Sequence, residues 1–172
     1  MVELMVSITI MALMAGAVLF NWRPTEQTFA LMRSAHQIAD DFRRVQQMAV
    51  STEAFTCDET DPDYSGYGIY LNISQPTEYL IFENCNNVNW TYSNPEDLIK
   101  ETQRLEEGVK IQGMTIGDPA SAASVVFVPP NPIIYINSTS EGVDLIITLE
   151  LIDDVSRTKQ IKINTAGRVE IN

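Results

Sequence analysis

Histidine, cysteine and the short motifs of catalysis are scarce in this chain. Its 172 residues include a single histidine, His36, and only two cysteines. The sequence contains no G-x-S-x-G nucleophile motif, no C-x-x-C pair and no glycine-rich phosphate loop. With no second ligand or nucleophile to accompany it, His36 is expected to be a structural residue. We therefore expect a protein that is not an enzyme and needs no cofactor.

Basic residues are also few. Lysine and arginine together number 11 against 23 aspartates and glutamates, which gives a net charge of -12. A chain this acidic repels a phosphate backbone, so the composition disfavours nucleic acid as a partner. Arg157, Lys159 and Lys162 lie close together in the sequence, but acidic residues around them interrupt any basic stripe.

What the chain does have is a long apolar opening, MVELMVSITIMALMAGAVLFNWRPTE. Residues 4–22 carry no charge, and as a helix these nineteen residues would be roughly 28 Å long, close to the hydrocarbon thickness of a bilayer. A single carboxylate, Glu3, comes immediately before this run.

Three ordinary interpretations of the opening each leave something unexplained. A cleaved secretory signal would begin with positive charge and end in a small-residue cleavage site. A buried core helix would usually be shorter. A simple membrane anchor fits the length, but it gives Glu3 no role. It also places Arg23 directly after the span with no basic residue before it, which favours the opposite orientation.

The stretch VELMVSITIMALMAGA resembles the start of mature type IV pilins and type II secretion pseudopilins. In that family a basic leader ending in Gly is removed by the prepilin peptidase, and the mature chain begins Phe, Thr, Leu, a β-branched residue, Glu. Val2 and Glu3 match the last two positions, and Met1 stands where the Leu would be. Further along, RSAHQIADDFRRVQQMAVS and the ending IKINTAGRVEIN resemble the minor-pilin branch that includes the type II secretion H pseudopilin.

The resemblance implies a filament subunit that is anchored in the inner membrane by one helix, with its head outside the cytoplasm, until it assembles with other pilin or pseudopilin subunits. It also implies that Glu3 meets the free amino terminus of a neighbouring subunit in the filament core. The alternative is an ordinary solvated carboxylate at a helix start, where the helix dipole favours it. We expect the DNA upstream of Met1 to encode the basic leader, its Gly and the Phe-Thr pair.

After Arg23 and Pro24 the pattern changes from apolar all round to amphipathic. One apolar stripe recurs at steps of three and four: Leu31, Ala35, Ile38, Phe42, Val45 and Ala49. We expect one continuous helix over residues 1–51, in which residues 1–22 belong to the membrane or filament core and residues 23–51 pack on the head. Asp40 and Arg44 are four apart and are expected to pair.

Residues 52–172 should form a β-rich globular head. Short segments rich in Ile, Val and Tyr and bounded by turn residues predict strands at 67–72, 78–83, 109–116, 124–128, 132–137, 144–151, 158–163 and 167–171. A helix followed by strands indicates an α+β fold, here a pilin-like one with a long N-terminal helix packed on an antiparallel sheet. Residues 94–108 are consistent with a short helix capped by Asn94, or with an excursion at the sheet edge.

The two cysteines, Cys57 and Cys85, flank the first predicted hairpin. In a head outside the cytoplasm we favour a disulfide between them over two free thiols. It would stabilise the head by roughly 3–4 kcal/mol on the loop-entropy argument.

The segment DPDYSGYGIYLN, residues 61–72, resembles half of an EF-hand calcium loop. The candidate calcium ligands are Asp61, Asp63, Ser65, the carbonyl of Tyr67 and Asn72. Asn72 stands where the loop requires a bidentate Glu, and the following residues predict a strand. A solvated turn therefore remains the competing interpretation.

Two functions remain open at this point. The chain is either a structural subunit of a type IV pilus or type II secretion filament, or a membrane-tethered head that binds a secreted substrate, ligand or DNA without polymerising. Glu3 distinguishes them, because a mere tether needs no carboxylate at that position.

Overall fold

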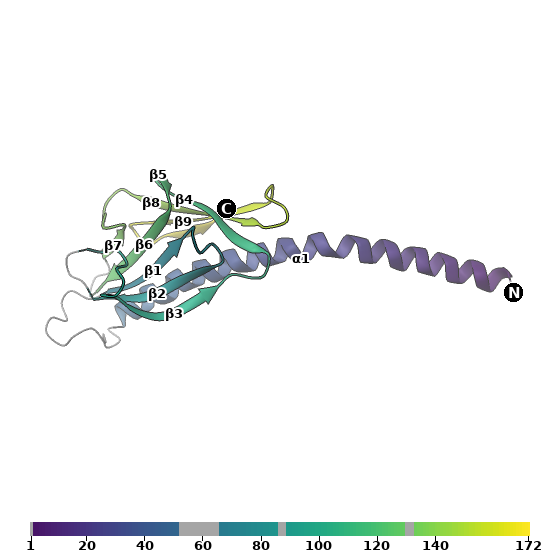
Figure 1. Ribbon diagram of the computed structural model, residues 1–172, viewed down its shortest axis with the longest axis horizontal. Helices are drawn as coiled ribbons and strands as arrows, with labels where there is room; N and C mark the ends of the chain where they lie inside the picture. The colour runs from purple at the N-terminus through teal and green to yellow at the C-terminus, as the bar shows by residue number, and fades with distance from the viewer. Residues whose placement is uncertain (1, 52–65, 86–88, 130–132) are drawn as a thin grey trace.

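The computed structural model describes residues 2–51, 66–85, 89–129 and 133–172; in residues 17–25 it describes the backbone but not the side chains. Calcium candidates Asp61, Asp63 and Ser65, and Cys57, lie outside the described residues. Within these described ranges, one helix, α1 (Val2–Val50), is followed by ten strands. The N-terminal half of α1 projects away from the head, and its C-terminal half lies along it (Figure 1).

The continuous helix expected from the sequence is confirmed. α1 runs unbroken for 49 residues and includes Pro24. Alanine, leucine and methionine are frequent along it, and all three have high helix propensity.

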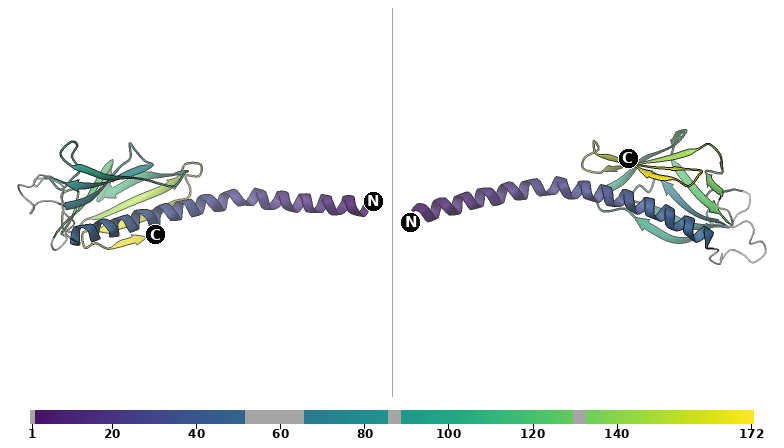
Figure 2. Two further views of the ribbon diagram at one scale, coloured as in Figure 1. Left: turned by 90° about the horizontal axis from the view of Figure 1, so that it is seen from below. Right: turned by 180° about the vertical axis from the view of Figure 1, so that it is seen from behind.

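The head consists of two antiparallel five-stranded sheets (Figures 1 and 2). The first has the order β3-β2-β1-β6-β7 and the second the order β10-β9-β8-β4-β5. The strands of the first sheet are β1 (Gly66–Asn72), β2 (Glu78–Asn84), β3 (Leu98–Arg104), β6 (Ala122–Val128) and β7 (Ile133–Ile136). Those of the second are β4 (Val109–Ile116), β5 (Asp118–Ala120), β8 (Asp144–Leu151), β9 (Thr158–Asn164) and β10 (Val169–Ile171). The expected α+β architecture is therefore present, and all eight predicted strands appear with shifts of a few residues at their ends.

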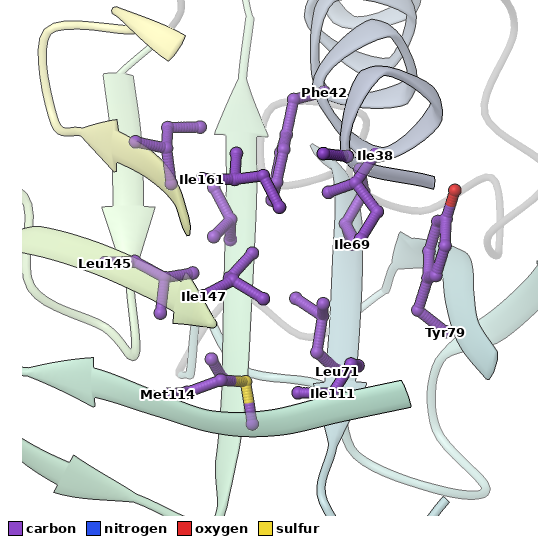
Figure 3. Close-up of a cluster of buried hydrophobic side chains, with 14 of the residues drawn as sticks. Ile38, Phe42, Ile69, Leu71, Tyr79, Ile111, Met114, Leu145, Ile147 and Ile161 are labelled. Carbon is purple, nitrogen blue, oxygen red and sulfur yellow. The ribbon is translucent and has the colours of Figure 1, made fainter. Parts of the chain in front are cut away.

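The apolar stripe of α1 packs into the core that the two sheets share. Its residues are almost completely buried: Leu31 is 2% exposed and Ala35, Ile38, Phe42, Val45 and Ala49 are each 0% exposed. Alternate residues of the strands face them, since side chains in a strand point to opposite faces of a sheet in turn. Figure 3 shows Ile38 and Phe42 of α1 near Ile69 of β1 and Ile161 of β9. The predicted packing face of the helix is thus confirmed.

The helix suggested for residues 94–108 is wrong. These residues contain β3, which pairs antiparallel with β2 and forms the edge of the first sheet, in line with the alternative of an edge excursion. Glu, Lys, Gln and Arg are good helix formers, but intrinsic propensity is a small preference, and hydrogen bonding to the open edge of β2 outweighs it. The buried Asp97 carboxylate also ties this segment to the end of β2, because it accepts hydrogen bonds from the backbone N–H groups of Cys85 and Ser93.

Polar contacts join α1 to the β2–β3 side of the head. Arg44 forms two hydrogen bonds with Glu101 of β3, at 3.1 and 2.8 Å. The buried Tyr79 hydroxyl donates to the Asp41 carboxylate at 2.5 Å. Burial is the main cause that raises the pKa of Tyr79 well above its usual value, and the Asp41 carboxylate raises it further. The predicted Asp40–Arg44 pair is wrong, because Arg44 turns to Asp41 and Glu101 while Asp40 pairs with Arg43 at 2.7 Å.

The buried stripe should carry much of the stability of the head. Phe42→Ala should lower the free energy of unfolding by about 3–5 kcal/mol, because it leaves a cavity in the core. The matched control is Phe29→Ala in the same helix. Phe29 is 54% exposed, so its loss should cost less than about 0.5 kcal/mol. Denaturant unfolding of the full chain in mild detergent compares the two, and equal costs would contradict the packing described above.

The Arg44–Glu101 pair should make stability depend on acid. The hydrogen bonds from Arg44 lower the pKa of Glu101, so this carboxylate stabilises the fold above its unfolded pKa, and the contribution is lost as the pH falls through the lowered folded value. Since both side chains are 41% exposed, Glu101→Gln should cost less than about 1 kcal/mol at neutral pH. Its difference from the parent should shrink as the pH falls below the unfolded pKa of Glu, about 4.3, and disappear once the pH is below the lowered pKa of folded Glu101. Urea unfolding midpoints measured across this pH range test this, with Glu107→Gln at an exposed turn residue as the matched control.

Candidate assembly surface

The first part of α1 has no cover from its own head. Every described side chain in residues 2–16 is exposed. The large apolar ones are Val2, Leu4, Met5, Val6, Ile8, Ile10, Met11, Leu13 and Met14, with exposed fractions between 50% for Ile10 and 76% for Val2. We call these nine side chains the bare helix surface. Residues 2–16 span about 22 Å along the axis at the usual rise of an α-helix.

The polar groups within this segment are satisfied inside the helix. The Ser7 hydroxyl donates to the carbonyl of Glu3 at 2.9 Å, and the Thr9 hydroxyl donates to that of Met5 at 2.7 Å. These bonds satisfy the two hydroxyl groups within the helix itself. The arrangement is common for Ser and Thr in helices that lie in apolar surroundings. The segment can therefore enter such surroundings at little polar cost apart from Glu3.

Glu3 is the one ionisable side chain in residues 2–22. It lies in the first turn of α1, and its side chain is exposed. No ion pair found among the described residues involves it. The head lies on the far half of the helix, so no described basic side chain of the head lies beside Glu3 (Figure 1).

Within residues 2–16, 26–51 and the rest of the described chain, no helix has an apolar segment long enough to cross a membrane.

The two described calcium candidates are not placed to share an ion. Tyr67 and Asn72 lie near opposite ends of β1, about 17 Å apart at the rise of an extended strand, whereas a calcium loop curls around its ion. The Asn72 side-chain oxygen already accepts the backbone N–H of Ser74 at 2.8 Å. Tyr67 and Asn72 therefore lie too far apart along the strand to bind the same ion, and the calcium prediction for Asp61, Asp63 and Ser65 concerns residues outside the described part of the chain. Within the described residues, no group of three or more His, Cys, Asp or Glu side chains is arranged to hold a metal ion.

Of the predicted disulfide pair, only Cys85 lies within the described residues, and its sulfur is in the disulfide form. The pairing with Cys57 remains a prediction.

The sequence interpretation missed one group of exposed apolar residues where the helix enters the head. Phe29 on α1 is 54% exposed, and Ile152 and Val155 on the loop between β8 and β9 are 49% and 63% exposed. We call these three side chains the head-base patch. The segment IDDVSR has the composition of a charged turn and no apolar periodicity, so nothing in the sequence indicated that Ile152 and Val155 form part of an exposed apolar surface.

No protein-family model matches the chain, and the searches of curated proteins and of solved structures find no match either. The case for a function therefore depends on the residues and geometry described above.

The bare helix surface should control solubility. A chain shortened to residues 26–172 keeps the buried stripe and should remain a single species without detergent, whereas the full chain should aggregate, because so large an apolar surface requires a cover. Size-exclusion chromatography with light scattering measures the difference. The full chain in detergent micelles is the control. A full chain that stays monomeric in plain buffer would show that residues 2–16 are not bare in solution.

Proposed function

We propose that this chain is a structural subunit, of the minor pilin or pseudopilin kind, of a type IV pilus or type II secretion filament. The observation that supports this most directly is the division of α1 into a part buried in its own head and a part left bare. The resemblance of the opening residues to mature pilins and pseudopilins supports the same function.

The energetic argument concerns the bare helix surface. Complete burial of one large aliphatic side chain is worth about 1.5–3 kcal/mol, so the nine side chains together represent a gross driving force of roughly 14–27 kcal/mol. The protein needs an apolar environment for them at every stage. In the proposed function this environment is the inner membrane before assembly and the helices of neighbouring subunits afterwards, once the prepilin peptidase has removed the leader.

Glu3 would make the second environment specific. A carboxylate in apolar surroundings is costly without a cation beside it, and lipid offers none. The free amino terminus of a neighbouring subunit would supply that cation in the filament. The pairing would also set the axial position of one helix against the next, because it is satisfied at a single register.

Replacement of Glu3 tests this role. In cells that carry the gene with its natural upstream sequence, Glu3→Ala should leave membrane insertion and the protease resistance of the head unchanged. It should greatly reduce recovery in sheared filaments, since an unpaired amine in a dry site costs about 3–5 kcal/mol. Glu26→Ala, the same change in the same helix but beyond the apolar run, is the control. Normal filament recovery for Glu3→Ala would reject the assembly role and favour a membrane-tethered binding head instead.

A further inference from the structure

The loop between β8 and β9, residues 152–157, is the part of the head that reaches furthest toward the N-terminus of α1 (Figure 1, yellow-green; Figure 2). Two of its six residues are apolar and exposed, Ile152 at 49% and Val155 at 63%. Together with Phe29 they form the head-base patch defined above.

Hydrogen bonds fix this loop at one height on the helix. Arg157 donates to the Thr28 hydroxyl at 2.7 Å, and Gln27 donates to the Asp153 carboxylate at 3.4 Å. The N–H of Ile152 donates to the carbonyl of Gly108 at 2.8 Å, which joins the loop to the neighbouring β3–β4 turn. Arg157 and Asp153 are thus bonded to the helix and Asp154 to Ser156 and Arg157 within the loop, while Ile152 and Val155 remain exposed.

If the uncharged run spans the hydrocarbon core, that height lies just outside the headgroup layer of a bilayer. Thr28 is six residues beyond position 22, where the uncharged run ends, so the loop lies about 9 Å past that end. The headgroup layer on each side of the hydrocarbon core is about 5–8 Å thick. The average tilt of a membrane helix, about 20°, would bring one side of the head closer still.

We propose that the head-base patch rests in the interfacial layer of the bilayer while the subunit is membrane-anchored. The inference depends on the membrane-anchored state in the proposed function. Asp153 and Asp154 outnumber the single cation of the loop, Arg157, so the loop carries no surplus positive charge to attract anionic lipid. The fitting partner is therefore a zwitterionic phospholipid surface, contacted through apolar side chains. This contact orients the head before assembly and must be released when the subunit leaves the membrane.

Spin labels on the full chain, reconstituted sparsely in phosphatidylcholine vesicles, test the contact. The labelled positions are Val155→Cys in the patch, Glu141→Cys as an exposed control at the opposite end of β8, and Met11→Cys on the bare helix surface. The measurement is the accessibility of each label to oxygen, which concentrates in lipid, and to a nickel chelate, which stays in water. The unsubstituted chain, taken through the same labelling, controls for reaction at the natural cysteines.

The expected result is a loss of nickel accessibility at position 155 relative to position 141, with position 11 deep in the lipid. A label at 155 that is as open to nickel as the one at 141, while position 11 is in lipid, overturns this inference and leaves membrane anchoring intact. A water-exposed label at position 11 overturns both. Protection at 155 that grows with the protein-to-lipid ratio would assign the patch to contact with a second copy and also overturn the inference.

Discussion

The packing of the α1 stripe between the two sheets is the contact on which the rest of the structure depends. The stripe touches strands of both sheets, so it joins two layers that are not hydrogen-bonded to each other in the described sheet topology. It also sets the direction of the helix relative to the head. Because α1 continues without a break, the same contact determines where residues 2–16 project and which loops of the head lie beside residues 26–33.

One helix thereby presents two kinds of surface. Its later part is amphipathic and complementary to a core made by its own chain, whereas its first part is apolar around its whole circumference, with its hydroxyl groups bonded to its own backbone. A helix that met only water beyond the head would have no use for such a surface. The transition from one kind of surface to the other falls at the base of the head, where Arg157 and Thr28 hold the β8–β9 loop against the helix.

The parts of this architecture that were predictable from the sequence are those set by periodicity. The steps of three and four from Leu31 to Ala49 identified the buried face, and the period of two identified most strands, because both follow directly from backbone geometry.

Pairings that depend on the tertiary fold were not predictable. Arg44 has Asp40 one turn before it, yet it bonds to Glu101, 57 residues away, because β3 runs past the helix. β3 itself lacks a clear apolar alternation, since it is an edge strand with mostly exposed side chains. The separation of Tyr67 and Asn72 along β1 was not predictable from the calcium-loop spacing, because a short sequence pattern does not show whether a segment curls around an ion or extends as a strand. The roles proposed for Glu3 and residues 4–22 could be inferred from the sequence, because the isolated charge and the length of the apolar run can be read there directly. The head-base patch could not be inferred in this way, because its residues are separated in sequence and come together only in the folded chain.

The continuity of α1 also has a mechanical consequence. A helix of 49 residues is about 73 Å long, and a pull on its first turns is directed along the axis that the head grips further on. Load applied in this direction acts on the stripe from Leu31 to Ala49 in shear, so the whole set of contacts resists at once instead of peeling open from one end. In the proposed function, this is the direction in which the helix would be pulled out of the membrane, with the folded head moving along with it.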